Sequence, residues 1–95
     1  MIIRELTIQN DTAIHISWTI SDGEQRAYDL FLIQNGAVVE RSKASSAATG
    51  CTLHTPIHSL TEYTLLLTVT VGEKLATARA SFLGNNRRLQ VYTNP

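Results

Sequence analysis

The sequence predicts an all-β protein, an antiparallel sandwich of about seven strands, and three observations support this prediction. Apolar and polar residues alternate with a period of two along most of the chain, and no apolar stripe with helical spacing is sustained. Turn signals separate about seven such runs, which favours a sandwich over an α/β unit. A tyrosine, Tyr63, begins a long apolar run directly after the corner-like segment 57–62.

The first half of the chain contains three runs and one hairpin. Residues 2–8 form a first strand, with Ile2, Leu6 and Ile8 expected on one face. The second strand alternates polar residues with a face made of Ile14, Ile16, Trp18 and Ile20. The third spans about residues 25–34 and presents Tyr28, Leu30 and Leu32 on one face. Asn35-Gly36 then predicts a two-residue hairpin, because both positions tolerate positive φ, with residues 37–40 as the return strand.

The second half begins with the small, polar segment 41–50, which we expect to be a loop or a weakly held edge strand. A short strand near residues 51–53 ends before Pro56, and the run from Tyr63 turns at residues 71–74. The last clear strand has one face made of Ala76, Ala78, Ala80 and Phe82. We therefore expect one domain over residues 1–84, followed by a C-terminal tail or linker over residues 85–95.

Composition excludes several classes of partner. Eight basic residues balance eight acidic ones, so the formal net charge is zero, which argues against nucleic acid and against an anionic membrane surface. The single cysteine, Cys51, allows no intrachain disulfide, which is compatible with a reducing compartment. The chain start has no signal-peptide pattern, and no stretch reaches the roughly 20 apolar residues of a membrane span. We expect a cytoplasmic chain, or a fragment of a larger protein.

No motif for catalysis or for a cofactor stands out. His54 and His58 are four residues apart, but Pro56 lies between them and no third ligand is evident, so surface histidines are favoured over a metal site. Cys51 has no neighbouring basic residue that would activate it, which favours a structural thiol. Trp18 alternates with isoleucines, which favours a core residue over a sugar-stacking platform. The sequence predicts no enzyme, no cofactor and no metal in this chain.

The most informative surface feature is apolar. Phe31 and Ile33 lie on the face of their strand opposite Tyr28, Leu30 and Leu32. Leu66 and Leu75 likewise point away from the apolar faces of their own strands. If these strands are neighbours in one sheet, Phe31, Ile33, Leu66 and Leu75 form an outward apolar patch, of the kind that marks a docking surface. The alternative is that other strands or the tail cover these residues.

Once strands and corner are in place, the chain resembles a fibronectin type III-like domain over roughly residues 3–82. In immunoglobulin-like sandwiches a tyrosine at such a corner ties its hydroxyl to an upstream backbone group. The residues that carry the resemblance are Trp18, the alternating Tyr28, Leu30 and Leu32, and the corner run Thr61-Glu62-Tyr63-Thr64-Leu65. The resemblance implies an immunoglobulin-like antiparallel sandwich and leaves the role of the domain open.

A narrower resemblance rests on Trp18 and on Gly23-Glu24-Gln25-Arg26-Ala27-Tyr28. This pattern is similar to the opening of the N-terminal fibronectin-like domain of bacterial α-L-rhamnosidases, where a strand tryptophan precedes Gln-x-Ala-Tyr. The chain departs from that family at Val39-Glu40-Arg41-Ser42, where Trp-Asp-Ser-Gly is usual, and at Leu65, where tryptophan is favoured. The resemblance implies a non-catalytic accessory domain of a carbohydrate-active enzyme that packs against other domains. The alternative is a standalone protein-interaction domain, for example a homodimer that buries the same apolar face.

Overall fold

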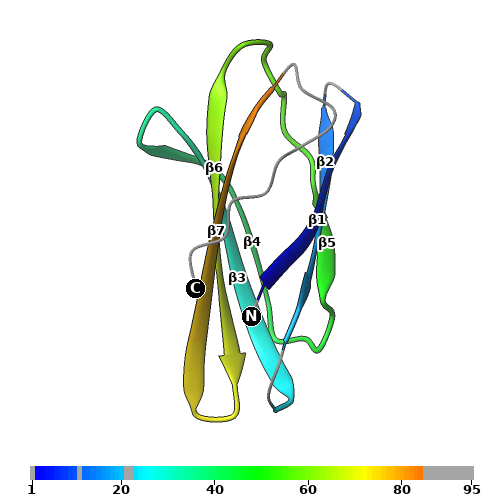
Figure 1. Ribbon diagram of the computed structural model, residues 1–95, viewed down its shortest axis with the longest axis vertical. Helices are drawn as coiled ribbons and strands as arrows, with labels where there is room; N and C mark the ends of the chain where they lie inside the picture. Colours follow the sequence, from blue (N-terminus) through cyan, green and yellow to red (C-terminus); the bar gives the residue numbers. More distant parts are fainter. Residues whose placement is uncertain (1, 11, 21–22, 85–95) are drawn as a thin grey trace.

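The computed structural model describes residues 2–10, 12–20 and 23–84, and these residues form seven β-strands and no helix. The strands are β1 (Ile2–Asn10), β2 (Ala13–Thr19), β3 (Gln25–Gln34), β4 (Ala37–Ala44), β5 (Gly50–Leu53), β6 (Glu62–Val71) and β7 (Lys74–Leu83). All pairings are antiparallel, and the strands lie in two facing sheets (Figure 1). The prediction of an antiparallel sandwich of about seven strands is confirmed.

The two sheets have the strand orders β1-β2-β5 and β4-β3-β6-β7. In the constant-type immunoglobulin arrangement the fourth strand lies in the sheet of the first, second and fifth. Here β4 joins the other sheet because a tight hairpin returns it alongside β3. Asn35 has a φ of 52° and Gly36 a φ of 78°, which are the positive values that a type I′ turn requires.

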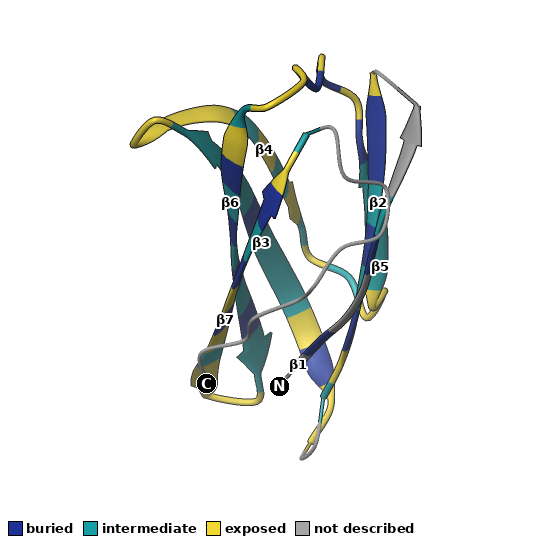
Figure 2. Ribbon diagram, turned by 45° about the horizontal axis from the view of Figure 1, so that its top comes forward, coloured by how far each residue is buried: buried dark blue, intermediate teal, exposed yellow. Residues whose placement is uncertain are grey.

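The central strands bury the faces that the sequence predicted. Leu30 and Leu32 of β3, together with Tyr63, Leu65, Leu67 and Val69 of β6, have no exposed surface. β7 of the same sheet adds Ala78, Ala80 and Phe82, and β2 of the facing sheet contributes Ile14, Ile16 and Trp18. Alternate residues of one strand point to opposite faces of a sheet, so these four strands bring one apolar face each to a shared core. Figure 2 shows the resulting alternation along β6.

The expected face of β1 did not include the buried Ile3, because the strand is not regular. The register of β1 against β2 shifts between Ile3 and Glu5 and again between Ile8 and Asn10. A bulge changes which face the following residues occupy, so Ile3 and Leu6, three residues apart, are both buried. Strict alternation from Leu6 had placed Ile2 and Ile8 on this face. The side chains of Ile2 and Ile8 lie outside the described residues.

The polar segment 41–50 divides into strand and loop. Residues 41–44 continue β4, because they pair with Tyr28–Phe31 of β3. The loop 45–49 is held by the buried side chain of Gln25, whose Nε2 donates to the carbonyl oxygens of Ser46 and Ala48 at 2.8 and 2.5 Å. Trp18 Nε1 in turn donates to Oε1 of Gln25 at 2.9 Å. One glutamine thus ties β2 and β3 to the loop that leads into β5.

The corner at Tyr63 has the predicted hydrogen bond. The backbone N–H of His58 donates to the Tyr63 hydroxyl, with 2.8 Å between nitrogen and oxygen. The Tyr63 ring stacks on the ring of Phe82, with 5.2 Å between the ring centroids. Gly84 closes the corner from the end of β7: its N–H donates to the carbonyl of Thr61 at 3.0 Å. A Cβ on Gly84 would lie only 2.0 Å from the carbonyl oxygen of His58, so the close approach requires glycine. The predicted tail, residues 85–95, lies outside the described residues.

Candidate docking surface

The apolar residues singled out in the sequence lie on the outer face of the four-stranded sheet. Phe31 of β3 stands directly opposite Leu66 of β6, and Ile33 is the next outward residue of β3. All three side chains are half-buried, whereas their neighbours Leu30, Leu32 and Leu67 are fully buried on the other side of the sheet. We call Phe31, Ile33 and Leu66 the outer-face patch. Cross-strand neighbours on one face lie about 5 Å apart, so the patch is contiguous.

Two arginines flank the row of Phe31 and Leu66. Arg41 of β4 is the cross-strand neighbour of Phe31, and Arg79 of β7 is that of Leu66. The Arg41 guanidinium lies 5.0 Å from the centre of the Phe31 ring, in cation–π contact. It also donates to both carboxylate oxygens of Asp29, at 2.9 and 2.7 Å. These hydrogen bonds lower the pKa of Asp29, so the pair remains ionised and fixes Arg41 over one side of the patch.

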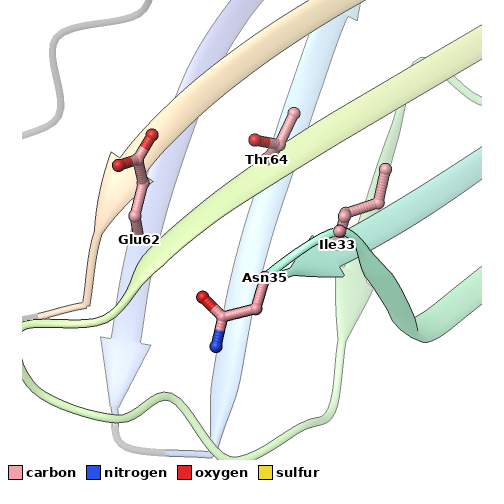
Figure 3. Close-up of a pocket in the computed structure, with 5 residues that line it drawn as sticks. Ile33, Asn35, Glu62 and Thr64 are labelled. Carbon is pink, nitrogen blue, oxygen red and sulfur yellow. The ribbon is translucent and has the colours of Figure 1, made fainter.

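A hollow of about 230 Å³ adjoins the patch at the β3–β4 hairpin. It is lined by Ile33, Asn35, Gly36, Glu62 and Thr64 (Figure 3). Glu62 supplies the one charged group of this lining, and the hydroxyl of Thr64 lies 3.4 Å from that of Ser81. The lining holds a single carboxylate, that of Glu62, and one hydroxyl, that of Thr64.

Leu75 does not belong with the other three residues. It stands opposite Thr70 of β6, four positions along the strand from Leu66, which is about 14 Å in an extended strand. Its side chain is 72% exposed. The structure therefore brings Phe31, Ile33 and Leu66 together and separates Leu75 from them by the row of Thr68 and Thr77.

Two exposed apolar residues, Val38 and Leu60, were not singled out from the sequence. Val38 is 56% exposed and stands opposite Ile33, where the register of β4 shifts, so it extends the patch. Leu60 is 77% exposed and has a φ of 59°, a backbone conformation that non-glycine residues rarely adopt. The apolar type of Val38 was visible in the sequence. The register of Val38 and the positive φ of Leu60 depend on the tertiary structure, which residue types do not reveal.

The other candidate groups are separate from this surface. His54 and His58 are exposed, and among the described residues no three His, Cys, Asp or Glu side chains gather as metal ligands would. Cys51 packs against the core, and desolvation raises the pKa of its thiol despite a hydrogen bond with Ser42. Trp18 is 2% exposed, so the core interpretation is confirmed and the sugar-platform interpretation is wrong. No helix within the described ranges could cross a membrane.

No protein-family model matches the chain, and no curated protein matches it. Among solved structures it is similar to domains d3-d4 of the extracellular region of rat CD45, with a TM-score of 0.57 and 19% sequence identity. The match covers 82% of this chain and 46% of the other, so this chain spans about half the length of that structure. At this identity the likeness shows the fold alone, a fibronectin type III-like β-sandwich.

Proposed function

We propose that this chain is a non-catalytic interaction module that docks to another protein domain through the outer-face patch. The observation that carries the proposal is the cross-strand pair of Phe31 and Leu66, which leaves apolar surface on the outside of a sheet whose inner face already fills the core. Ile33 and the exposed Val38 extend this surface toward the hollow beside Glu62. Contiguous apolar residues on an outer sheet face are typical of surfaces that a partner covers.

The chemistry of the described residues favours binding over catalysis. Burial raises the pKa of Cys51, which is the opposite of what activates a nucleophile. The hollow offers Glu62 without a second titratable group in its lining, so it lacks the acid and base pair of a hydrolase. These observations support a module that works by surface contact.

The finer role that we propose is that of an accessory domain in a larger, cytoplasmic carbohydrate-active enzyme similar to the bacterial α-L-rhamnosidases. The sequence resemblance at Trp18, Gln25 and Tyr28 supports it. The indole N–H of Trp18 donates a hydrogen bond to Gln25, and the rings of Trp18 and Tyr28 lie edge to face with their centroids 5.2 Å apart. The same contacts also stabilise the sandwich. The spacing of Trp18, Gln25 and Tyr28 therefore reflects the packing of the fold as well as the family resemblance. A reading frame that continues into a helical-barrel glycosidase supports this role, and one without it contradicts it.

The docking surface is tested by comparing Leu66→Ser with the matched variant Leu60→Asn, which alters an exposed leucine outside the patch. Both variants should fold, because neither side chain belongs to the buried core. Wherever the chain occurs with a further domain, Leu66→Ser should release that domain to limited proteolysis, and Leu60→Asn should not. Release by neither variant would contradict docking through this face. Light scattering of the isolated chain addresses the alternative: a dimer that Leu66→Ser dissociates would identify a homodimer.

A further inference from the structure

The four sheet edges of the sandwich differ in how well they resist pairing with another strand. Edge strands expose free N–H and C=O groups, and proteins protect them with bulges, charges or short length. Two register shifts interrupt β1, β5 has four residues, and β4 has a register shift beside Val38 together with the charges of Arg41 and Lys43. By contrast, β7 has ten residues, no proline and an unbroken register against β6. β1 approaches β7 from the other sheet, but among the described strands only β6 pairs with it.

The outward side chains of β7 have a symmetrical pattern. Arg79 lies midway between Leu75 and Leu83, four positions from each. Leu75 and Leu83 are 72% and 44% exposed, and Arg79 is exposed as well. β7 contains Lys74 and Arg79 but no carboxylate. Among the residues whose side chains the structure describes, the one ion pair joins Arg41 and Asp29, so no described carboxylate pairs with either cation of β7.

This pattern selects among the strands that could pair with β7. A second copy of the chain, paired antiparallel so that Leu75 meets Leu83, would set Arg79 against Arg79 of the other copy. Like charges directly opposite one another destabilise a strand pair. A strand with a carboxylate at that position would instead form an ion pair with Arg79, while apolar residues four positions to either side would cover the two leucines.

We propose that the edge of β7 binds an extended acidic segment of another protein by strand addition. The segment has a carboxylate opposite Arg79 and apolar residues opposite Leu75 and Leu83. Backbone hydrogen bonds supply the affinity, and the side chains on one face supply the selectivity. The site adjoins the outer-face patch at Arg79, the cross-strand neighbour of Leu66, but differs from it because it uses the backbone of β7 and the side chains along that strand.

A synthetic peptide tests this inference: acetyl-Leu-Thr-Thr-Thr-Glu-Thr-Thr-Thr-Leu-amide, which presents the same pattern in either strand direction. Its control has lysine in place of glutamate. Titration of the ¹⁵N-labelled chain should shift the amide signals of β7, with the glutamate peptide bound roughly 1.5- to 5-fold more tightly, as expected for one cross-strand charge pair. The exposed substitution Arg79→Glu should reverse this preference, and the strands and core should keep their native chemical shifts.

Three results would overturn the inference. The first is the absence of changes in β7 at millimolar peptide. The second is equal binding of the two peptides. The third is a shift of the β7 signals with protein concentration alone, which would make a second copy the occupant. Phe31→Ser should leave peptide binding unchanged, so failure here and failure of docking through the outer-face patch are separate outcomes.

Discussion

Single residues connect distant parts of this sandwich, and Gln25 does so most clearly. Its side chain is 5% exposed, and its amide contacts the Trp18 indole and two carbonyl groups of the loop 45–49. Buried polar groups must be hydrogen-bonded to be tolerated, and here one amide satisfies three partners at once. Gln25 therefore fixes the path of a segment whose own residues have weak structural preferences.

We expect Gln25→Leu to lower the free energy of unfolding by about 2–3 kcal/mol, because it leaves buried donors and acceptors without partners. Urea denaturation measures this loss, and cleavage by a protease should increase within residues 45–49. The matched variant Arg26→Gln alters the exposed neighbour on β3 and should change stability by less than about 0.5 kcal/mol. Equal stability of the two variants would mean that the glutamine network does not hold the loop.

We expect Tyr63→Phe to cost about 1 kcal/mol of unfolding free energy, because the N–H of His58 loses the hydroxyl that accepts its hydrogen bond. Tyr28→Phe is the control, since the hydroxyl of that half-buried tyrosine makes no hydrogen bond with any of the described residues. Thermal or urea unfolding of both variants provides the comparison. A larger effect at Tyr28 than at Tyr63 would contradict the role assigned to the corner.

The raised pKa of Cys51 predicts a loss of stability in alkali. The folded state disfavours the thiolate, so the stabilisation is fully present below the pKa of the unfolded thiol, about 8.5, and is lost as pH rises through the folded pKa. Unfolding free energies measured from pH 7 to pH 10 should therefore fall more steeply for the native chain than for Cys51→Ala. Iodoacetamide should react faster with the urea-unfolded chain than with the folded one at pH 8.5.

Strands and turns are the scale at which sequence patterns were most informative. Alternation located β2, β3, β6 and β7 and assigned their core faces, because each pairs in nearly regular register. It missed Ile3 of β1, which a bulge places beside Leu6 in the core. It left residues 41–44 open between a loop and an edge strand, because they owe their extended form to pairing with β3. Local pattern predicts a strand only as far as the register stays regular.

At the hairpin, we expect Gly36→Ala to destabilise the protein by roughly 1 kcal/mol, because alanine disfavours a positive φ. No atom lies within 4 Å of the added Cβ, so backbone strain is the whole effect. Gly84→Ala should be more harmful, since its Cβ would collide with the backbone of His58. Differential scanning calorimetry of the two variants orders these costs, and the reverse order would contradict the tight corner.

At the scale of the whole molecule, the two sheets of the described residues enclose one core. The Cα radius of gyration is 12.7 Å, as expected for a single compact domain of this length. The sequence identified three members of the outer-face patch, because alternation also predicts which apolar residues face outward. It included Leu75 wrongly in that group, and it could not find the hollow beside Glu62. The place of Leu75 and the shape of the hollow both depend on how far each strand extends past its neighbour. Long-range strand pairing determines that extent.

The most direct test of the central claim is the accessibility of methyl groups to a soluble paramagnetic agent, measured by NMR. In the dilute, isolated chain the methyls of Leu66 and Ile33 should be broadened more than those of the buried Leu67. With the partner domain attached, or at concentrations where the chain dimerises, they should become protected, while Leu60 stays accessible. The account is contradicted if Leu66 and Ile33 are already as protected as Leu67 in the isolated chain, or if they remain exposed in every assembled state.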